Sequence, residues 1–588
     1  MRALSLFGVL VVARVLVLFG RDADLSFWTP FAYLWQDVVV ALVFATLDRF
    51  WGKRTGWVVY AALVVYAAIN VPVTRILSSP LTWTMIRAAG APLQDSIALY
   101  LSPTNIALIL LVIAAGIGFP LLSQRFTLRL TNPAFAAATA VILLGMFSTS
   151  KVATLGMHRN AIGALWPARI PVSNVMASDT DPRISPYPAR SSEDLSAFRG
   201  AASGRNIVLI ILESTAARYL KPYGAAEDPM PNLTELARES VVFDSAYAVY
   251  PESIKGLFST LCSRYPGFAT DAEKYADVPC ASVVRQFADA GYRTGLFHSG
   301  RFMYLGMEAV IENRGFDTLE DAGAIGGNVN SSFGVDEPAT VQRMLSWIDS
   351  VPKGQPFFLA YLPVAGHHPY ISPGGPFDEN TEFGRYLNAL HAGDAALGEF
   401  LRGLRSRDLD RNTLYVVFGD HGEAFGQHSG NYGHTLFIHD ENVRVPYLIA
   451  APGVVKQQIH IGRLASLIDT APTLLDLAGL PISSSFQGSS LLEPQARMAL
   501  FFTDYSLGWL GLRDGCLKYT YETAADWSRL YDVCGDPEEV RDLSKSDPER
   551  IAQYREIVSR WIQPRSGGTL PAPGFSRGNP TFMPTKAP

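Results

Sequence analysis

The stretch Phe418-Gly-Asp-His-Gly-Glu-Ala-Phe-Gly-Gln-His428 places a carboxylate and an imidazole side by side, as Asp420 and His421. It continues an apolar run of β-branched and aromatic residues, 413–418, that predicts a buried parallel strand. Ligands gather at the carboxyl ends of strands in open α/β sheets. An oxygen and a nitrogen donor at that edge suit a divalent metal, although a polar turn with glycines would give a similar local pattern.

A second buried strand is predicted over residues 206–212, and it ends at Glu213 just as the first ends at Asp420. Further apolar runs predict strands at 292–297, 356–364 and 445–450, and helical patterns lie at 231–240, 282–290 and 339–350. Alternation of strands and helices favours a mostly parallel sheet covered by helices on both faces. Glu213, Asp420 and His421 can then face one cleft as three metal ligands.

The candidate nucleophile is Ser253, which follows Pro251 and Glu252 at the start of a predicted helix. A helix start offers backbone N–H groups to an anion, and a metal ligated by the serine oxygen would lower its pKa. The local sequence fits equally well a serine that only caps the helix.

Three histidines stand at predicted strand exits or close to the metal motif. His298 follows residues 294–297, His367 follows the strand 356–364, and His434 lies thirteen residues beyond His421. A histidine at such a place can hold an oxyanion or protonate a leaving group. One of them alone is more often structural, and their shared placement favours a site.

Residues 1–150 predict a transmembrane domain of about five helices. Apolar segments lie at 4–20, 36–48, 56–75, 106–122 and 133–149, and several reach the roughly 17–25 residues that a membrane helix needs. The alternatives are a signal peptide for the first segment and a buried helical bundle for the group. A transporter would need paired charges or broken helices at midspan, and we count only Arg14 within the predicted spans.

The short loops 48–54 and 124–129 are both basic, which predicts that they are cytoplasmic. An odd number of spans then leaves the rest of the chain outside. The expected location is therefore the inner or cytoplasmic membrane, with a multi-pass anchor and an extracytoplasmic catalytic domain. The net charge of −5 gives no indication of a nucleic-acid partner.

The four cysteines fit an exported domain, because none lies in the membrane part. Cys262–Cys280 and Cys516–Cys534 are the simplest of the three possible pairings, and a reduced, buried set is the alternative. The predicted organisation is a transmembrane domain at 1–150, a proline-containing connector at 151–204, a catalytic domain at 205–565 and a flexible tail at 566–588.

With these motifs the chain resembles the alkaline phosphatase/sulfatase superfamily in its membrane-anchored form, in the layout of lipoteichoic acid synthases and lipid A phosphoethanolamine transferases. The most specific motif is Gly-Asp-His-Gly-Glu at 419–423, with support from residues 206–215, 466–475 and 530–538. The last of these resembles the small C-terminal subdomain of sulfatases. The resemblance covers residues 205–545 by motif and the N-terminal part by topology.

The resemblance implies roles for the candidate residues. Glu213, Asp420 and His421, together with Ser253, match the metal site, and Ser253 matches the nucleophile. His367 and His434 match histidines that bind the transferred group, and His298 matches a pocket histidine. The basic residues Lys255 and Arg301 are further candidates for substrate binding.

Departures from the family separate its branches. Ser253 is followed by neither the proline nor the arginine needed for conversion to formylglycine, which disfavours sulfate-ester hydrolysis by that route. The tryptophan and arginine that follow the pocket histidine in lipoteichoic acid synthases are missing at those offsets, where Arg301 is a possible substitute.

The resemblance implies a metal-dependent phosphotransferase that holds one divalent ion, zinc, manganese or magnesium. It would move a phosphoglycerol- or phosphoethanolamine-like headgroup from a membrane phospholipid to a glycan or lipid acceptor through a covalent Ser253 intermediate. The alternatives are a phosphodiesterase, phosphatase or sulfatase-like hydrolase, and a catalytically inactive scaffold.

Overall fold

The computed structural model describes residues 2–562 except for several short segments. These are residues 22–25, 78, 83–85, 87–99, 124–131, 150, 153, 155, 166–180, 188–192, 269–274, 277, 304–305, 329–333 and 506–507. The predicted flexible tail at 566–588, the basic loop at 124–129 and parts of the connector lie outside the described residues.

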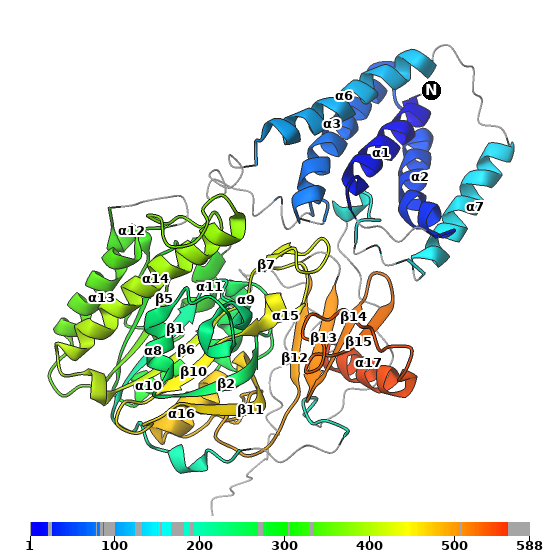
Figure 1. The fold of residues 1–588 in the computed structure, drawn as a ribbon. Helices are drawn as coiled ribbons and strands as arrows, with labels where there is room; N and C mark the ends of the chain where they lie inside the picture. The colour runs from blue at the N-terminus through cyan, green and yellow to red at the C-terminus, as the bar shows by residue number, and fades with distance from the viewer. Residues whose placement is uncertain are drawn as a thin grey trace, which may run out of the picture.

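Each of the five apolar segments forms a helix, and together they make the N-terminal bundle (Figure 1). The helices are α1 (Arg2–Leu18), α2 (Thr29–Leu47), α3 (Lys53–Leu77), α6 (Pro103–Ser123) and α7 (Asn132–Ser148). Three of them, α2, α3 and α6, are long and apolar enough to cross a membrane. α1 and α7 have 17 residues each, so the count of five spans stays a prediction.

The charge count within the predicted spans was wrong. Asp37 of α2 lies within the span 36–48, and Asp48 and Arg75 are the last residues of the spans 36–48 and 56–75. The Asp37 carboxylate pairs with the Arg14 guanidinium of α1 at 3.0 Å. Asp37 is 1 % exposed, so the pair is buried in the bundle. Paired charges therefore do not distinguish this bundle from a transporter.

The catalytic domain is built on a nine-stranded sheet of order β11-β2-β10-β6-β1-β5-β3-β4, with β9 paired to β2. Its strands are β1 (Asn206–Leu212), β2 (Ser240–Tyr247), β3 (Arg293–His298), β4 (Thr318–Glu320), β5 (Phe357–Leu362), β6 (Thr413–Gly419), β9 (Arg444–Val445), β10 (Tyr447–Ala450) and β11 (Ile459–Ser466). The pairings of β1 with β5 and β6 are parallel, whereas β10 runs antiparallel to both β2 and β6. The sheet is thus mixed and mostly parallel, as expected.

Helices cover both faces of the sheet because its central strands are apolar on both sides. Along β1, Ile207 and Leu209 face one core and Val208 and Ile210 face the other. The first core includes residues of α9 (Ser253–Cys262), α10 (Val283–Asp289), α11 (Met307–Ile311) and α16 (Thr470–Ala478). The second includes residues of α8 (Pro231–Ala237), α13 (Glu337–Ser350) and α14 (Glu382–Arg405).

Two sequence expectations need correction. The predicted strand 445–450 is divided between β9 and β10, and it is antiparallel to β2 and β6. The predicted helix 231–240 ends at Ala237, since Ser240 already begins β2. The short helices α12 (Ala322–Ile325) and α15 (Asp440–Val443) and the hairpin of β7 (Ala424–Phe425) and β8 (Tyr432–Gly433) also belong to this domain.

A small C-terminal subdomain follows, as the sequence predicted. It is an antiparallel sheet of β12 (Ala499–Thr503), β13 (Trp509–Asp514), β14 (Leu517–Glu522) and β15 (Trp527–Asp532), packed with α17 (Pro548–Ile562). Both predicted disulfides are present, Cys262–Cys280 and Cys516–Cys534.

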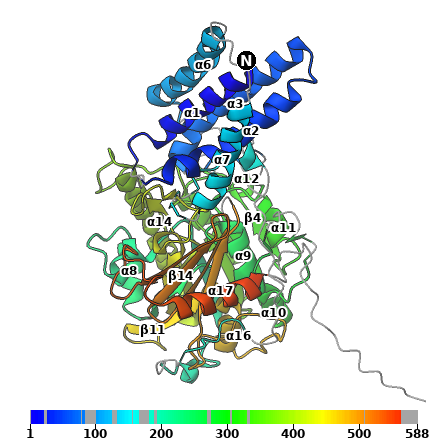
Figure 2. The same ribbon diagram turned by 90° about the vertical axis from the view of Figure 1, so that its right-hand side faces the viewer.

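The bundle lies at one end of the catalytic domain in both Figure 1 and Figure 2. α3 lies beside β8, and Leu81, just beyond α3, packs on a cluster that includes Leu436 and Phe437. Leu436 and Phe437 come two and three residues after His434 in the chain. The bundle therefore contacts the catalytic domain close to a predicted site residue.

Candidate active site

The ends of β1 and β6 bring the predicted metal ligands together. The two strands pair in parallel register with Leu212 opposite Gly419, so Glu213 and Asp420 leave the same edge of the sheet. A Cβ on Gly419 would lie 2.3 Å from the carbonyl oxygen of Thr215, so only glycine permits this approach. The adjacent strand exits bring these side chains together at one edge of the sheet.

The three predicted ligand side chains turn toward one point. Nε2 of His421 lies 3.4 Å from Oε1 of Glu213 and 3.5 Å from Oδ2 of Asp420. Nδ1 of His421 lies 3.0 Å from the carbonyl oxygen of Gly422, so Nε2 is the ring nitrogen turned toward the two carboxylates. All three side chains are almost fully buried.

Ser253 is the first residue of α9, and its hydroxyl points into this cluster. Oγ of Ser253 donates to Oε2 of Glu213 at 2.8 Å and lies 3.3 Å from Nε2 of His421. The cap of α9 is Glu252, whose carboxylate accepts from the backbone N–H groups of Ile254 and Lys255. Glu252 therefore takes the capping role that the sequence left open for Ser253, and the serine hydroxyl faces the cluster.

The backbone beside Glu213 adopts an unusual conformation. Ser214 has φ of 53°, in the left-handed region that costs a non-glycine residue about 1 kcal/mol or more. The turn directs the Ser214 N–H to Oδ1 of Asp420 at 3.0 Å and its hydroxyl to Oε1 of Glu213 at 2.9 Å. Ser214 thus fixes one oxygen of each carboxylate.

The charges of the cluster favour a bound cation. Burial and the charge of Glu213 raise the pKa of Asp420, whereas the pKa of Glu213 falls because His421 outweighs the effect of burial. Burial lowers the pKa of His421, but the two carboxylates more than compensate and raise it. Two buried carboxylates beside a shared imidazole are the donor set of a divalent metal, and their ligand atoms lie within 4.8 Å of one another.

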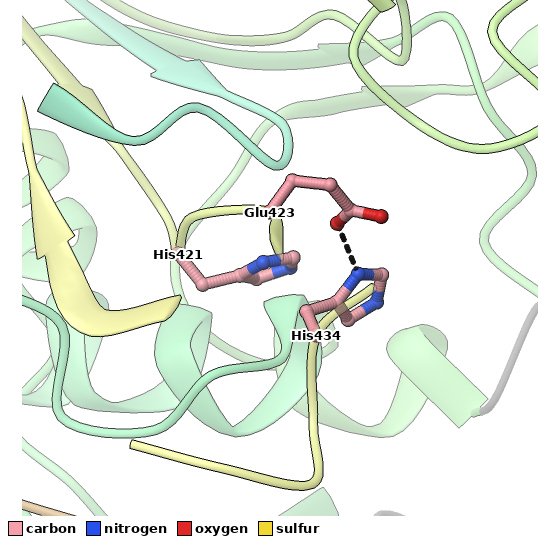
Figure 3. Close-up of side chains that lie close together, drawn as sticks. All are labelled: His421, Glu423 and His434. Atoms are coloured by element: carbon pink, nitrogen blue, oxygen red, sulfur yellow. Dashed lines mark hydrogen bonds and ion pairs between the residues drawn. The ribbon is translucent and has the colours of Figure 1, made fainter. Parts of the chain in front are cut away.

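A second group of side chains adjoins the first through His421. The rings of His421 and His434 lie 4.3 Å apart, and Nδ1 of His434 lies 2.6 Å from Oε2 of Glu423 (Figure 3). The other oxygen of Glu423 accepts from the Tyr370 hydroxyl at 2.7 Å. Glu423 therefore fixes the ring of His434 and leaves its Nε2 for chemistry.

His367 and His298 lie on the neighbouring strand exits. The ring centroids of His367 and His434 are 6.1 Å apart, and Nδ1 of His367 lies 2.5 Å from the carbonyl oxygen of His368. His298 ends β3, where its Nδ1 lies 2.9 Å from the carbonyl oxygen of Leu362. Burial lowers the pKa of both imidazoles, so each is neutral near pH 7.

The structure also places the two basic candidates, Lys255 and Arg301. The Lys255 ammonium is held by Asp504 at 2.7 Å and lies over the ring of Tyr250. The guanidinium of Arg301 lies near Gly323 of α12, where an added Cβ would be 3.8 Å from it. Substrate binding by Lys255 and Arg301 stays a prediction.

Sequence reasoning did not select Glu423, Tyr370 or Ser214. Glu423 stands inside the decisive motif, two residues beyond His421, and its spacing is a usable signal. Its pairing with Tyr370 and His434 spans 53 and 11 residues, so the fold alone reveals it.

Another cluster of histidines and carboxylates joins the C-terminal subdomain to the catalytic domain. Its two histidine rings stack at 3.6 Å, with Nδ1 of His428 at 2.7 Å from Glu441 and Nδ1 of His439 at 2.6 Å from Glu539. The buried ammonium of Lys518 pairs with Glu539. A lysine within the cluster supplies the positive charge that a metal would bring, so this cluster is structural.

Comparisons with known proteins agree with this geometry. Residues 205–480 match the model of the sulfatase family. A lipoteichoic acid synthase-like protein of Bacillus subtilis, YvgJ, is 24% identical over 323 residues, which are 52% of each chain. The ulvan-active sulfatase of Formosa agariphila is 25% identical over 395 residues, 58% of this chain and 76% of that protein. The chain thus spans about half the length of the synthase-like relative.

A solved structure shares the fold. The crystal structure of the lipoteichoic acid synthase LtaP from Listeria monocytogenes superposes with a TM-score of 0.52 at 18% identity, covering 63% of this chain and 94% of that one. The mixed sheet and the ligand residues at its strand exits lie within the matched residues, and the C-terminal subdomain lies beyond them. Residues 205–480, which are less than half of the chain, therefore resemble sulfatase-family domains in sequence, and the fold is that of the solved synthase structure.

Proposed function

We propose that the protein is a phosphotransferase that moves a phospho-headgroup from a membrane phospholipid to a hydroxyl of a glycan or lipid acceptor. The observation that carries this proposal is the Ser253 hydroxyl at the start of α9, 2.8 Å from Glu213 and 3.3 Å from His421. A serine oxygen beside a metal donor set and a helix start is arranged for attack on phosphorus.

Glu213, Asp420, His421 and Ser253 would hold one divalent cation, zinc, manganese or magnesium. When bound, the ion would lower the pKa of the serine hydroxyl and offset charge on the phosphoryl oxygens. Glu213 accepts the Ser253 proton, since the hydroxyl already donates to its carboxylate. The bond from Oγ to phosphorus forms as the bond from phosphorus to the diacylglycerol oxygen breaks.

The histidines handle the remaining proton and the phosphoryl oxygens. His434, held by Glu423, gives a proton to the departing diacylglycerol oxygen and takes one back from the acceptor hydroxyl that replaces it. His367 keeps its Nδ1 on the His368 carbonyl, so its Nε2 is available to a phosphoryl oxygen. The attack of the acceptor then breaks the bond from Oγ to phosphorus, and Glu213 returns the proton to Oγ, which restores Ser253.

The place of the bundle supports a lipid donor. Three of its helices are long and apolar enough to cross a membrane, and α3 lies beside β8, next to His434. Anchorage in this position concentrates a lipid headgroup near the site. With five spans and basic inner loops, the catalytic domain would lie outside the inner or cytoplasmic membrane.

Mass spectrometry of the Ser253 peptide tests the proposal. The full chain in detergent is incubated with mixed phospholipids and either manganese or zinc, with Ser253→Ala as the control. A mass adduct on Ser253 establishes the covalent step, and its size identifies the headgroup. Released headgroup without transfer to a glycan or lipid supports the hydrolase that the sulfatase relatives favour, and neither adduct nor release under any metal overturns the enzyme mechanism.

A further inference from the structure

The bundle reaches the active-site edge of the catalytic domain through Tyr100, which lies three residues before the start of α6. Its ring stacks on the His368 imidazole, with the ring centroids 5.5 Å apart and the planes 10° from parallel. The Tyr100 hydroxyl lies 3.3 Å from Nε2 of His368. Burial raises the pKa of Tyr100 to about 12, and burial lowers the pKa of His368 to about 4, so a neutral phenol meets a neutral imidazole at pH 7.

His368 is connected to both proposed catalytic histidines. Its carbonyl oxygen holds Nδ1 of His367 at 2.5 Å. Its ring packs edge-to-face on Tyr370, whose hydroxyl donates to Glu423 at 2.7 Å. Glu423 in turn holds His434. The short segment 367–370 therefore sets the orientation of His367 directly and that of His434 through Glu423.

We propose that Tyr100 is a positioning residue through which the bundle holds segment 367–370, and with it His367 and His434, in the arrangement needed for catalysis. Within the part of the chain that the structure describes, the Tyr100 side chain hydrogen-bonds to and stacks on His368 and not on a ligand side chain, so it acts through the segment and is not itself catalytic. Leu81 packs beside Leu436 and Phe437, which gives the bundle a second contact with the catalytic domain next to His434. The activity part of this inference rests on the proposed function.

Two substitutions separate the parts of the Tyr100 contact. Tyr100→Phe keeps the stacked ring and loses only the hydroxyl, whereas Tyr100→Ala removes both. Leu101→Ala is the matched control, because Leu101 is the next residue and its side chain is 62 % exposed. All three variants are compared with the wild type as full chains in detergent.

Hydrogen–deuterium exchange by mass spectrometry gives a readout that needs no activity. The His367 N–H donates to the carbonyl oxygen of Val364 and the Tyr370 N–H to that of His367, so both bonds lie within residues 363–371. We expect Tyr100→Ala to raise exchange in peptides covering 363–371 about tenfold, because local opening follows lost contacts. Tyr100→Phe and Leu101→Ala should exchange like the wild type. Unchanged exchange in Tyr100→Ala would overturn the inference whatever the enzyme does.

Turnover of bis-p-nitrophenyl phosphate, a soluble phosphodiester, gives the second readout. We expect Tyr100→Ala to lower kcat about tenfold while KM changes by less than about twofold, since displaced catalytic groups impair the transition state more than binding. The ring in Tyr100→Phe should restore most of kcat, and Leu101→Ala should match the wild type. A wild-type kcat in Tyr100→Ala refutes the positioning role, whereas an inactive wild type with raised exchange in Tyr100→Ala refutes only the proposed function.

Discussion

Gly366 offers a direct test of how closely the two strand exits of the site approach one another. It joins the end of β5 to His367. A Cβ at this position would lie 2.2 Å from the carbonyl oxygen of Glu213 and 3.2 Å from its carbonyl carbon. A carbon–oxygen contact needs about 3.3 Å, so Gly366→Ala leaves a shortfall of about 1 Å. Both colliding groups are main chain, and no flexible side chain can turn away.

The expected loss of activity follows from that shortfall. Either Glu213 or His367 must move by about 1 Å, and a displacement of that size in a catalytic site costs about 100-fold in rate. This corresponds to about 2.7 kcal/mol of transition-state stabilisation. Overpacking should also lower the free energy of unfolding by about 1–3 kcal/mol. The loss in kcat/KM should therefore be large while the fold persists.

The assay is kcat/KM for bis-p-nitrophenyl phosphate, with the free energy of unfolding measured on the same preparation. Gly462→Ala is the control, because its Cβ would lie 3.7 Å from the nearest atom, a carboxylate oxygen of Glu193, which is ordinary contact. If Gly366→Ala keeps activity within about threefold of the wild type and equal stability, the reasoning fails, since a 1 Å displacement should cost far more.

Three further predictions concern stability. Burial raises the pKa of Glu337 from 4.5 to about 7, so between these values the folded state holds a proton that the unfolded chain has lost, and stability falls as pH rises through this window. The free energy of unfolding, measured by heat and by denaturant, should be equal for Glu337→Gln and the wild type near pH 5. At pH 8 the variant should be more stable by up to roughly 3 kcal/mol. A difference in unfolding free energy that does not change with pH contradicts this prediction. Replacing both Cys516 and Cys534 with serine removes a disulfide between residues 18 positions apart. Under non-reducing conditions this should lower the free energy of unfolding by about 3 kcal/mol relative to the wild type. Under reducing conditions the variant and the wild type should be equally stable. Arg14→Met leaves Asp37 buried without its ion pair and should lower the unfolding free energy in detergent by about 3–5 kcal/mol, a loss that Asp37→Leu in the same chain should largely reverse.

The central strands could be predicted from sequence because burial on both faces leaves an uninterrupted apolar run. β1 has the predicted bounds, and β6 differs from its prediction only by including Gly419. The direction of β10 could not be predicted in this way, since an apolar run reads alike for parallel and antiparallel pairing. Its antiparallel pairing with β6 depends on chain connections that only the fold settles.

The longest helix of the catalytic domain escaped prediction for a different reason. α14 contains four glycines, which suggest a break when only the sequence is considered. In the fold, other parts of the chain pack closely against these glycines. A Cβ on Gly398 would lie 2.4 Å from Asn232, and one on Gly384 would collide with the main chain of Asp378. Tertiary packing therefore overrides the low helix propensity.

The candidate site was predictable where function is carried by strand exits and not where it is carried by pairing across distant loops. Glu213, Asp420 and His421 follow apolar strands, and their convergence follows from the parallel register of β1 and β6. Tyr100 and His368 are 268 residues apart in the chain, and the local sequence around neither residue predicts their contact. Such contacts arise from how the bundle meets the catalytic domain.

The role of the buried charges Arg14 and Asp37 in the bundle also becomes clear only from the fold. The Arg14 guanidinium donates to Asp37, to the carbonyl oxygen of Met157 and to that of Arg159 at 3.1 Å. Asp37 also accepts from the side-chain amide of Asn160 at 2.5 Å. Arg14 and Asp37 are thus both hydrogen-bonded to the segment that follows α7. A pair engaged in this way fixes the start of the connector to α1 and α2, which favours a structural clamp over a path for a transported ion. The clamp would limit how far the catalytic domain can move from the bundle, as the Tyr100 contact requires.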